Sequence, residues 1–190
     1  MFDDGCFDNW GKSYEDIWVC AGKYKNQFCT KEIFEELREN DPELRVVAFA
    51  MNEKEIAQAI ANPIGCMIGS DGGINQGSGH PRAAGTFPRV LGKYVREDQV
   101  LPLIDALYKM TKVTADRLEL YNKGCIEVGC DADITIFDPD TIMDGATFED
   151  ITIPPSGIDY VLVNGQIAMK NNVQVNGRAG KFIPGPYTVE

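Results

Sequence analysis

Three residues with chemically useful side chains, Asp71, His80 and Arg82, lie close together near the middle of the chain. A short apolar run, residues 64–68, ends just before Asp71. Its length and flanking glycines are typical of a strand buried on both faces of a parallel sheet. Loops at the carboxyl ends of parallel strands converge on one edge of the sheet, and reactive groups gather there. Asp71 is therefore the first candidate for a catalytic residue.

An ordinary turn is the alternative, because an aspartate followed by two glycines often bonds its own backbone. The segment that follows, residues 72–87, favours a functional role. It is long and glycine-rich, and it carries the only histidine of the chain, His80, beside Arg82. Loops of this length inside compact domains are usually functional or disordered.

The elements that would position these residues alternate between strand and helix over the first 70 residues. Apolar patterns predict strands at 14–21 (with 17–21 as the apolar end), 45–51 and 64–68, and helices at 30–39 and 53–61. Thr30 and Asn52 are the expected N-caps of the two helices. The short connections predict right-handed βαβ units and about three parallel strands, too few for a closed barrel of eight.

The second half changes from helix to strand. Pro88 is expected at a helix start, residues 97–110 have helical periodicity with Pro102 in the first turn, and 114–120 suggest a short helix. Strands are expected at 134–137, 160–163, 166–169 and 173–175, and Asn164-Gly165 predicts a tight hairpin. We therefore predict a domain boundary near residue 122, with one domain over 1–122 and a β-only domain over 123–190.

Composition excludes several classes of protein. A hydrophobic fraction of 44% supports a core, but no run approaches the ~20 apolar residues of a membrane span. The N-terminus lacks the pattern of a signal peptide, so we expect a cytoplasmic location. A net charge of −11 disfavours nucleic acid and anionic membranes as partners. The six cysteines show no Cys-x-x-Cys spacing and predict reduced, packed thiols rather than a zinc finger.

Several motifs around the candidate residues resemble a known family. From about residue 44 to the end, the chain closely resembles the C-terminal half of the N-acyl-D-amino-acid deacylases (D-aminoacylases) of the amidohydrolase superfamily. The matching stretches are Ser70-Asp-Gly72, His80-Pro-Arg82, Gly85-Thr-Phe-Pro-Arg-Val-Leu-Gly92, Lys109-Met-Thr111, Gly129-Cys-Asp-Ala-Asp133 and Val163-Asn-Gly165. The His-Pro-Arg and Gly-Thr-Phe-Pro-Arg motifs are the most particular to this family.

This resemblance implies an α/β fold: the C-terminal portion of a metal-bearing (β/α)8 barrel followed by part of a small β-sandwich. Asp71 matches the general base, which takes a proton from the attacking water and passes it to the leaving amine. Arg82 matches the arginine that binds the substrate's α-carboxylate. His80 is a further candidate for substrate binding, with an orienting or surface role as the alternative.

The metal ligands of the family are missing. Its site uses a His-x-His pair and further Cys and His ligands, whereas this sequence has one histidine. We therefore expect zinc in the complete enzyme and none bound by this chain alone, which would be inactive. The expected partners are an N-acyl-D-amino acid and either the missing N-terminal half or a second copy of the chain. Two alternatives remain: a non-catalytic interaction or assembly module, and an amidohydrolase of other specificity, such as a dihydroorotase-like enzyme for cyclic amides.

Overall fold

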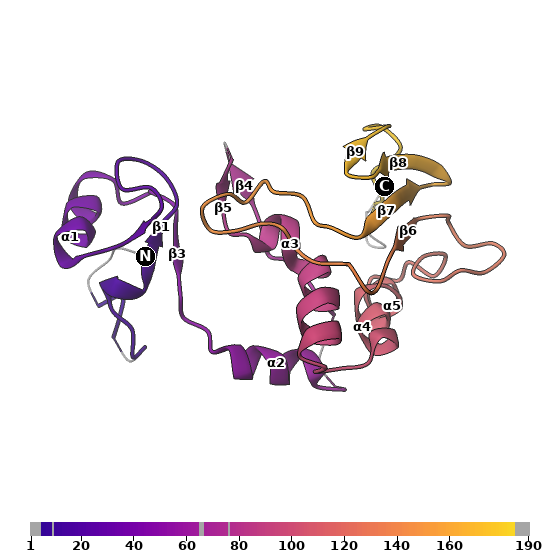
Figure 1. Cartoon of the computed structure of the whole chain (residues 1–190), viewed down its shortest axis with the longest axis horizontal. Coiled ribbons are helices and arrows are strands. Elements are labelled where there is room, and N and C mark those ends of the chain that lie inside the picture. The colour runs from indigo at the N-terminus through magenta and orange to yellow at the C-terminus, as the bar shows by residue number, and fades with distance from the viewer. Residues whose placement is uncertain (1–4, 9, 65–66, 76, 185–190) are drawn as a thin grey trace.

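The computed structural model describes residues 5–8, 10–64, 67–75 and 77–184. Its elements are spread along one long axis (Figure 1). A small N-terminal sheet with one helix occupies one end, a group of helices the middle, and a β-rich tail the other end. Helix α2 (Glu53–Ala61) connects the sheet to the helices. Among the described residues, no helix is both long and apolar enough to cross a bilayer.

The N-terminal sheet contains three short strands in the order β2-β1-β3. They are β1 (Ile17–Val19), β2 (Gln27–Phe28) and β3 (Val46–Ala48), preceded by the 3-10 turn η1 (Tyr14–Asp16). Side chains alternate across β1: Ile17 and Val19 pack with buried residues of helix α1 (Lys31–Asn40), while Trp18 lies in a separate cluster with Cys20 and Val47. The helix thus covers one face of the sheet.

The prediction of neighbouring parallel strands is wrong for this sheet. Strand β1 pairs antiparallel with both β2 and β3. The cause is a reversal directly after β1, where Gly22 and Asn26 adopt positive φ and the Asn26 amide bonds the Val19 carbonyl at 2.9 Å. The reversal creates β2, and α1 then returns the chain to the other edge of β1. Strands β2 and β3 therefore run in the same direction, but β1 lies between them.

The two predicted helix starts in the first half are confirmed. The Thr30 hydroxyl accepts the Ile33 amide at 3.3 Å, and the Asn52 side chain accepts the Lys54 amide at 2.8 Å. The buried strand predicted at 64–68 is not found. Residues 65 and 66 lie outside the described residues, Ile64 is 95% exposed, and Met67 and Ile68 are in no strand. The Ile68 amide bonds the Lys109 carbonyl at 3.3 Å instead of a neighbouring strand.

The segment predicted as a long loop contains regular structure. Strands β4 (Ile74–Asn75) and β5 (Ser78–Gly79) pair as a hairpin. Helix α3 (Arg82–Arg89) begins three residues after the end of β5 and continues as the π-helix η2 (Val90–Glu97). Pro88 is therefore inside the helix and not at its start. Because Pro88 has no amide to donate, it interrupts the α-helical bonding, and the wider π register follows it.

The later helices are shorter than predicted. Helix α4 spans Leu103–Met110 and α5 spans Lys112–Arg117. Residues 98–102 separate α4 from η2: Gln99 has a φ of 52°, and Pro102 has an extended ψ of 147°. Proline also disfavours helical backbone in the residue before it, so Pro102 delays the helix start to Leu103.

The strands predicted in the tail are confirmed. They form a four-stranded antiparallel sheet in the order β6-β7-β8-β9. Their bounds are β6 (Ile134–Phe137), β7 (Ile158–Val163), β8 (Gln166–Lys170) and β9 (Val173–Gln174). Asn164 and Gly165 have φ values of 53° and 76° and join β7 to β8, as their sequence predicts.

Two glycines let the chain between β6 and β7 pass close to the central helix, which is formed by α3 and η2. A Cβ on Gly85 would lie 2.9 Å from Asp144 Cβ, and one on Gly92 would lie 2.6 Å from the Ile142 carbonyl oxygen. The crossing buries Ile142, which is 2% exposed, among Val90, Leu91 and other residues of the helical cluster. The tail is therefore packed against the helical part through a contact that needs glycine.

The prediction that the cysteines are reduced, packed thiols holds for only some of them. Cys20 and Cys29 are buried and free, and burial raises the pKa of Cys29 to about 11, so it stays a neutral thiol. Cys125 and Cys130, by contrast, form a disulfide, which the sequence did not indicate. Their separation of five residues matches no common metal or redox motif, so spacing gave no signal.

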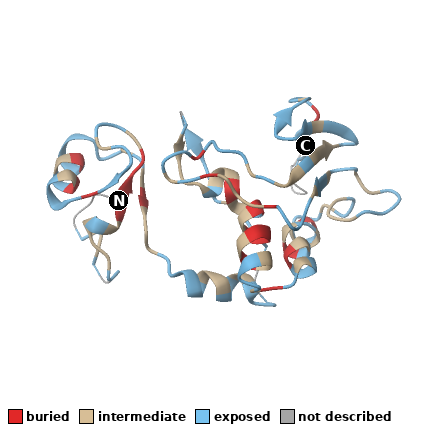
Figure 2. Ribbon diagram, viewed as in Figure 1, coloured by how far each residue is buried: buried red, intermediate tan, exposed pale blue. Residues whose placement is uncertain are grey.

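The chain exposes more surface to solvent than expected for a compact protein of its mass. The chain exposes 12470 Å², whereas a compact monomer of 21.0 kDa exposes about 9,000 Å². Figure 2 shows buried residues confined to short stretches, mainly in β1 and the central helix. The described core is likewise divided into three clusters. The exposed area is therefore larger than that of a compact monomer of this mass.

Candidate active site

A cleft of about 1140 Å³ lies between the N-terminal sheet and the central helix. Asp71, His80 and Arg82 all line it. Its other walls include β3, residues along α2 from Glu53 to Ile60, and residues 144 and 146–149 of the tail. The candidates chosen from sequence therefore share one concave surface, the usual setting of a small-molecule site.

Asp71 and Arg82 are in direct contact. Arg82 Nη2 lies 2.8 Å from Asp71 Oδ2, and Arg82 Nε donates to the Asp71 carbonyl oxygen at 3.1 Å. The Asp71 side chain is 92% exposed and that of Arg82 43% exposed. A pair this open to water contributes at most about 1 kcal/mol to stability. The contact orients both groups and leaves them accessible to a ligand.

Arg82 keeps donors for a ligand while it holds Asp71. A guanidinium carries five N–H donors. The two bonds to Asp71 use Nε and one hydrogen of Nη2. The remaining Nη2 hydrogen and both Nη1 hydrogens make no bond within the part of the chain that the structure describes. This end of the guanidinium matches a carboxylate in a two-point arrangement.

Close backbone packing brings the pair together. A Cβ on Gly72 would lie 2.4 Å from Ala83 Cα, and one on Gly79 would lie 2.3 Å from the Gly73 carbonyl oxygen. Only glycine permits these approaches, so the segment after Asp71 lies directly against the start of α3. Asp71 itself has a φ of 44°, a conformation that aspartate and asparagine tolerate better than most residues. The ordinary turn considered as the alternative is not found at residues 71–73, and the Asp71 carboxylate bonds Arg82 instead of its own backbone.

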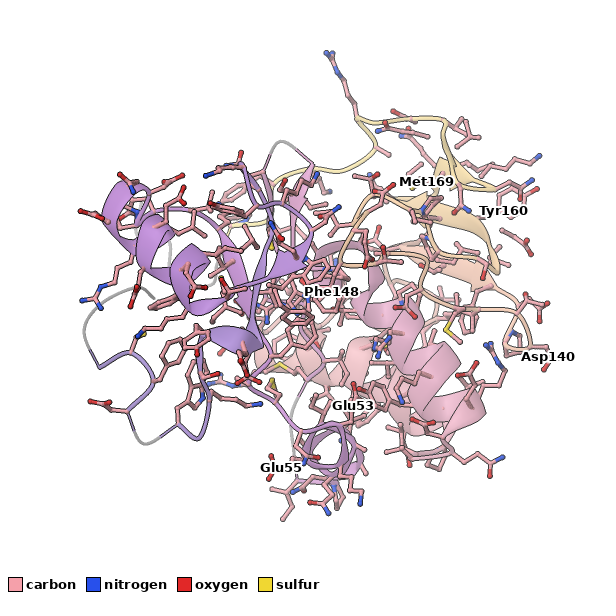
Figure 3. All side chains as sticks on the ribbon, turned by 60° about the vertical axis from the view of Figure 1, so that its left-hand side comes forward. Glu53, Glu55, Asp140, Phe148, Tyr160 and Met169 are labelled. Atoms are coloured by element: carbon pink, nitrogen blue, oxygen red, sulfur yellow. A yellow bond between two sulfur atoms is a disulfide. The ribbon has the colours of Figure 1, made fainter. Side chains whose placement is uncertain are left out.

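His80 contacts Arg82 and an aromatic ring of the tail. Its Nδ1 accepts the Arg82 backbone amide at 3.1 Å, and its ring meets Phe148 edge-on at 5.2 Å between centroids. Figure 3 shows Phe148 where the N-terminal segment meets the central helices. Burial, then Arg82 and Arg89, lower the pKa of His80 below its ordinary value of 6.5. The imidazole is therefore neutral at pH 7.

A second polar group lies in the cleft around Arg89, and the sequence did not indicate its carboxylate partners. Its Nη1 lies 3.4 Å from Asp144 Oδ2 and its Nη2 lies 3.6 Å from Glu53 Oε1. Tyr94 donates to Glu53 Oε2 at 3.0 Å. Burial opposes the charge of Arg89, but Asp144 and Tyr94 outweigh it and raise the pKa of Arg89. Glu53 looks in sequence like any acid in a first helical turn, and Asp144 lies in no motif, so only the fold reveals the group.

Lys109 holds the segment that leads to Asp71. This lysine is 8% exposed, and its Nζ donates to the carbonyls of Ile60 and Asn62 at 2.7 and 2.6 Å. Its backbone carbonyl accepts the Ile68 amide. Both carbonyls bound by Nζ lie at the end of α2, where a positive charge is favourable. Lys109 thus ties α4 both to the end of α2 and to Ile68.

We expect Lys109→Met to destabilise the chain by about 1–2 kcal/mol, because two carbonyls lose a charged donor at similar side-chain volume. The exposure of Asn62 keeps the cost in that range, since water replaces part of the bonding. Urea unfolding followed by circular dichroism measures the change. Lys54→Met, at an exposed position of α2, is the control and should cost under about 0.5 kcal/mol. Equal midpoints for the two variants would contradict the role of Lys109.

The described residues do not fit a zinc site on their own. They contain no group of three or more His, Cys, Asp or Glu side chains placed to bind a metal ion. The one histidine, His80, faces Phe148 and Arg82, and its Nδ1 is already an acceptor. Zinc requires three or four protein ligands. Among the residues that the structure describes, His80 alone provides too few ligands for a zinc ion at this cleft.

Residues 33–169 match the Amidohydrolase family, and the chain belongs to that family. Within it, the chain is 44% identical over 119 residues to the N-acyl-D-glutamate deacylase of Alcaligenes xylosoxydans xylosoxydans. It is 40% identical over 146 residues to the D-aminoacylase of the same organism. The resemblance to D-aminoacylases noted in the sequence is thus confirmed.

A solved structure shares the fold. The N-acyl-D-glutamate deacylase of Bordetella bronchiseptica, complexed with zinc and a phosphonate inhibitor that mimics the tetrahedral intermediate, superposes with a TM-score of 0.77 at 30% identity. The match covers 89% of this chain and 37% of that one. The matches to the two Alcaligenes enzymes cover 63% and 75% of this chain, but only 24% and 30% of theirs. The chain therefore spans about a third of the length of its relatives.

Proposed function

We propose that this chain is one part of a zinc-dependent N-acyl-D-amino-acid deacylase, which hydrolyses the amide to a carboxylate and a free D-amino acid. Asp71 is the general base and Arg82 binds the α-carboxylate of the substrate. The main support is the contact between Asp71 and Arg82 in the cleft, at 2.8 Å, in a chain whose relatives are deacylases. The zinc of the complete enzyme is held by residues outside this chain.

In this proposal Asp71 transfers protons and Arg82 binds the substrate. Asp71 accepts a proton from the attacking water and later delivers it to the nitrogen of the leaving amine. Arg82 offers its free Nη1 and Nη2 hydrogens to the carboxylate of the bound amino acid. Because the same guanidinium also holds Asp71, the position of the substrate carboxylate is fixed relative to the base. A fixed geometry of this kind lowers the entropic cost of reaching the transition state.

Reconstitution tests the proposal. The chain replaces the corresponding C-terminal part of the Bordetella N-acyl-D-glutamate deacylase in a chimera, and the free chain is assayed beside it. N-acetyl-D-glutamate and its L-enantiomer serve as substrates, with and without a chelator. We expect chelator-sensitive hydrolysis of the D-substrate by the chimera and none by the free chain. Robust zinc-dependent turnover by the free chain, or a folded chimera without activity, contradicts the proposal.

We expect Arg82→Gln in the chimera to raise the KM for the N-acyl-D-amino acid by about 10²-fold with a smaller change in kcat, because a two-point charged contact is lost. The same variant should hydrolyse the corresponding C-terminal carboxamide as well as the unmodified chimera does. Arg117→Gln, at an exposed position of α5, is the matched control and should leave both substrates unaffected. An equal loss on both substrates would assign Arg82 to something other than carboxylate binding.

Assembly without catalysis is a second candidate, favoured by the large uncovered surface of 12470 Å². A second copy of the chain would cover part of this surface in the absence of the remainder of the enzyme. Light scattering of the free chain distinguishes the two cases. A stable dimer that stays intact when the remainder of a deacylase is added supports the assembly module, whereas exchange into a heteromeric complex supports the enzyme.

A further inference from the structure

Arg82 is the first residue of helix α3. The first amides of a helix lack partners within the helix and need other acceptors. The N-cap residue here is Pro81, which makes no side-chain bond. The Ala83 amide bonds the His80 carbonyl at 3.0 Å, and the Ala84 and Gly85 amides bond the Pro81 carbonyl. The amide of Arg82 is left, and His80 Nδ1 accepts it at 3.1 Å.

We propose that His80 is a positioning residue that acts through Arg82: its Nδ1 caps the amide of Arg82 and so fixes the guanidinium against Asp71. This inference rests on the proposed function and deepens it, because it replaces substrate contact by His80 with control of the residue that binds substrate. The bond is of the short-range type in which a side-chain acceptor meets the amide two residues later. The following Pro81 favours the extended backbone that such a cap requires of His80.

The ring of His80 is held from its other side by aromatic packing. Phe148 meets it edge-on at 5.2 Å, and Phe148 in turn packs against Phe49 at 4.8 Å. Phe49 contacts Phe28 at 5.2 Å, so the contacts reach β2 of the N-terminal sheet. The imidazole is thus clamped between a packed cluster and the start of α3. Its orientation is fixed by the fold and does not depend on a ligand.

The protonation of the ring agrees with a capping role. Nδ1 accepts a hydrogen bond, so in the neutral ring the proton lies on Nε2. The charged groups that face the ring, Arg82 and Arg89, are both cationic, and with burial they lower its pKa. The acceptor therefore persists at neutral pH. A charged imidazolium would lose the acceptor and repel Arg82.

The first test is spectroscopic and needs no activity. His80 is the only histidine, so nitrogen-15 spectra of the free chain give one set of imidazole signals. We expect an unprotonated Nδ1 and a protonated Nε2 at pH 7.5. Hydrogen exchange of the Arg82 amide should be slow in the wild type and in His80→Asn, and about tenfold faster in His80→Gln. A proton on Nδ1, or equal exchange in all three proteins, overturns the inference.

The two variants are matched by geometry. The Oδ1 atom of asparagine stands as many bonds from the backbone as Nδ1 of histidine, and Oε1 of glutamine as many as Nε2. His80→Asn therefore keeps an acceptor at the Nδ1 position that caps the Arg82 amide. His80→Gln has an acceptor only at the Nε2 position and loses this cap. In the active chimera we expect KM to stay within about threefold for His80→Asn and to rise about tenfold for His80→Gln, with kcat nearly unchanged in both.

The outcomes separate this inference from the proposed function. A fall in kcat of about 10²-fold in both variants would show that His80 takes part in the chemistry and overturn the positioning role. Full activity in both variants would overturn it as well. If the chimera with His80 intact is inactive, the proposed function fails, while the tautomer and the exchange of the Arg82 amide still decide whether His80 positions Arg82.

Discussion

Asp71→Asn in the active chimera should lower kcat by about 10²- to 10⁴-fold, the usual contribution of a general base, with little change in KM. Asparagine has the same size and also tolerates the positive φ of residue 71, so the substitution removes the charge and leaves the backbone conformation in place. It also retains an oxygen for Arg82. Steady-state hydrolysis of N-acetyl-D-glutamate measures the effect.

Asp159→Asn provides the control for that experiment, since Asp159 is an exposed aspartate on β7 and does not line the cleft. It should leave kcat and KM unchanged. A kcat for Asp71→Asn within threefold of the unmodified chimera would remove the general-base role from Asp71. A large rise in KM alone would instead show that the carboxylate serves only to orient Arg82.

Gly92→Ala should destabilise the fold, because the added methyl group meets the backbone of the tail. Its Cβ would lie 2.6 Å from the Ile142 carbonyl oxygen and 2.8 Å from Met143 Sδ. The methionine side chain has room to turn away, but the backbone carbonyl does not move without separating the tail from the helix. We expect a loss of about 1–3 kcal/mol in the free energy of unfolding, the range for an overpacked core. Urea unfolding of the free chain measures it.

Gly69→Ala is the control for the expected loss of stability in Gly92→Ala. A Cβ on Gly69 would meet nothing within 4 Å, and its backbone does not adopt positive φ. Gly69→Ala should therefore change stability by less than about 0.5 kcal/mol. If Gly92→Ala unfolds at the same urea concentration as Gly69→Ala, the tail does not pack on the helix through this contact.

Local signals in the sequence predicted the elements that depend on few residues. Thr30 and Asn52 start their helices because a side-chain acceptor two or three residues before an amide is sufficient for a cap. Asn164-Gly165 forms its hairpin because both residues accept positive φ. Asp71 and Arg82 were named as partners in one site through motifs of the family, and they lie 2.8 Å apart.

Features that depend on distant contacts were not predictable from a single sequence. The apolar alternation in β1 is the same for a parallel and an antiparallel neighbour, so the direction of the sheet was wrong. The strand at 64–68 was expected from apolar residues alone, but the described residues of that segment, Ile64, Met67 and Ile68, bond no neighbouring strand. Pro88 favours a helix start in isolation, and only burial against other elements holds it inside α3. Asp144 lines the cleft because Gly85 has no Cβ, which allows the segment that carries Asp144 to pack closely against α3.

The crossing of the tail over the central helix bears on how such enzymes are recombined. Residues Asp144, Ala146 and Phe148 lie in the tail that we predict to begin near residue 122, and all three line the cleft. A library that shuffles family members at that junction would therefore exchange part of the cleft lining together with the β strands. Crossover points placed before Asp71 would instead transfer Asp71, Arg82 and this strip of the cleft as one inherited unit.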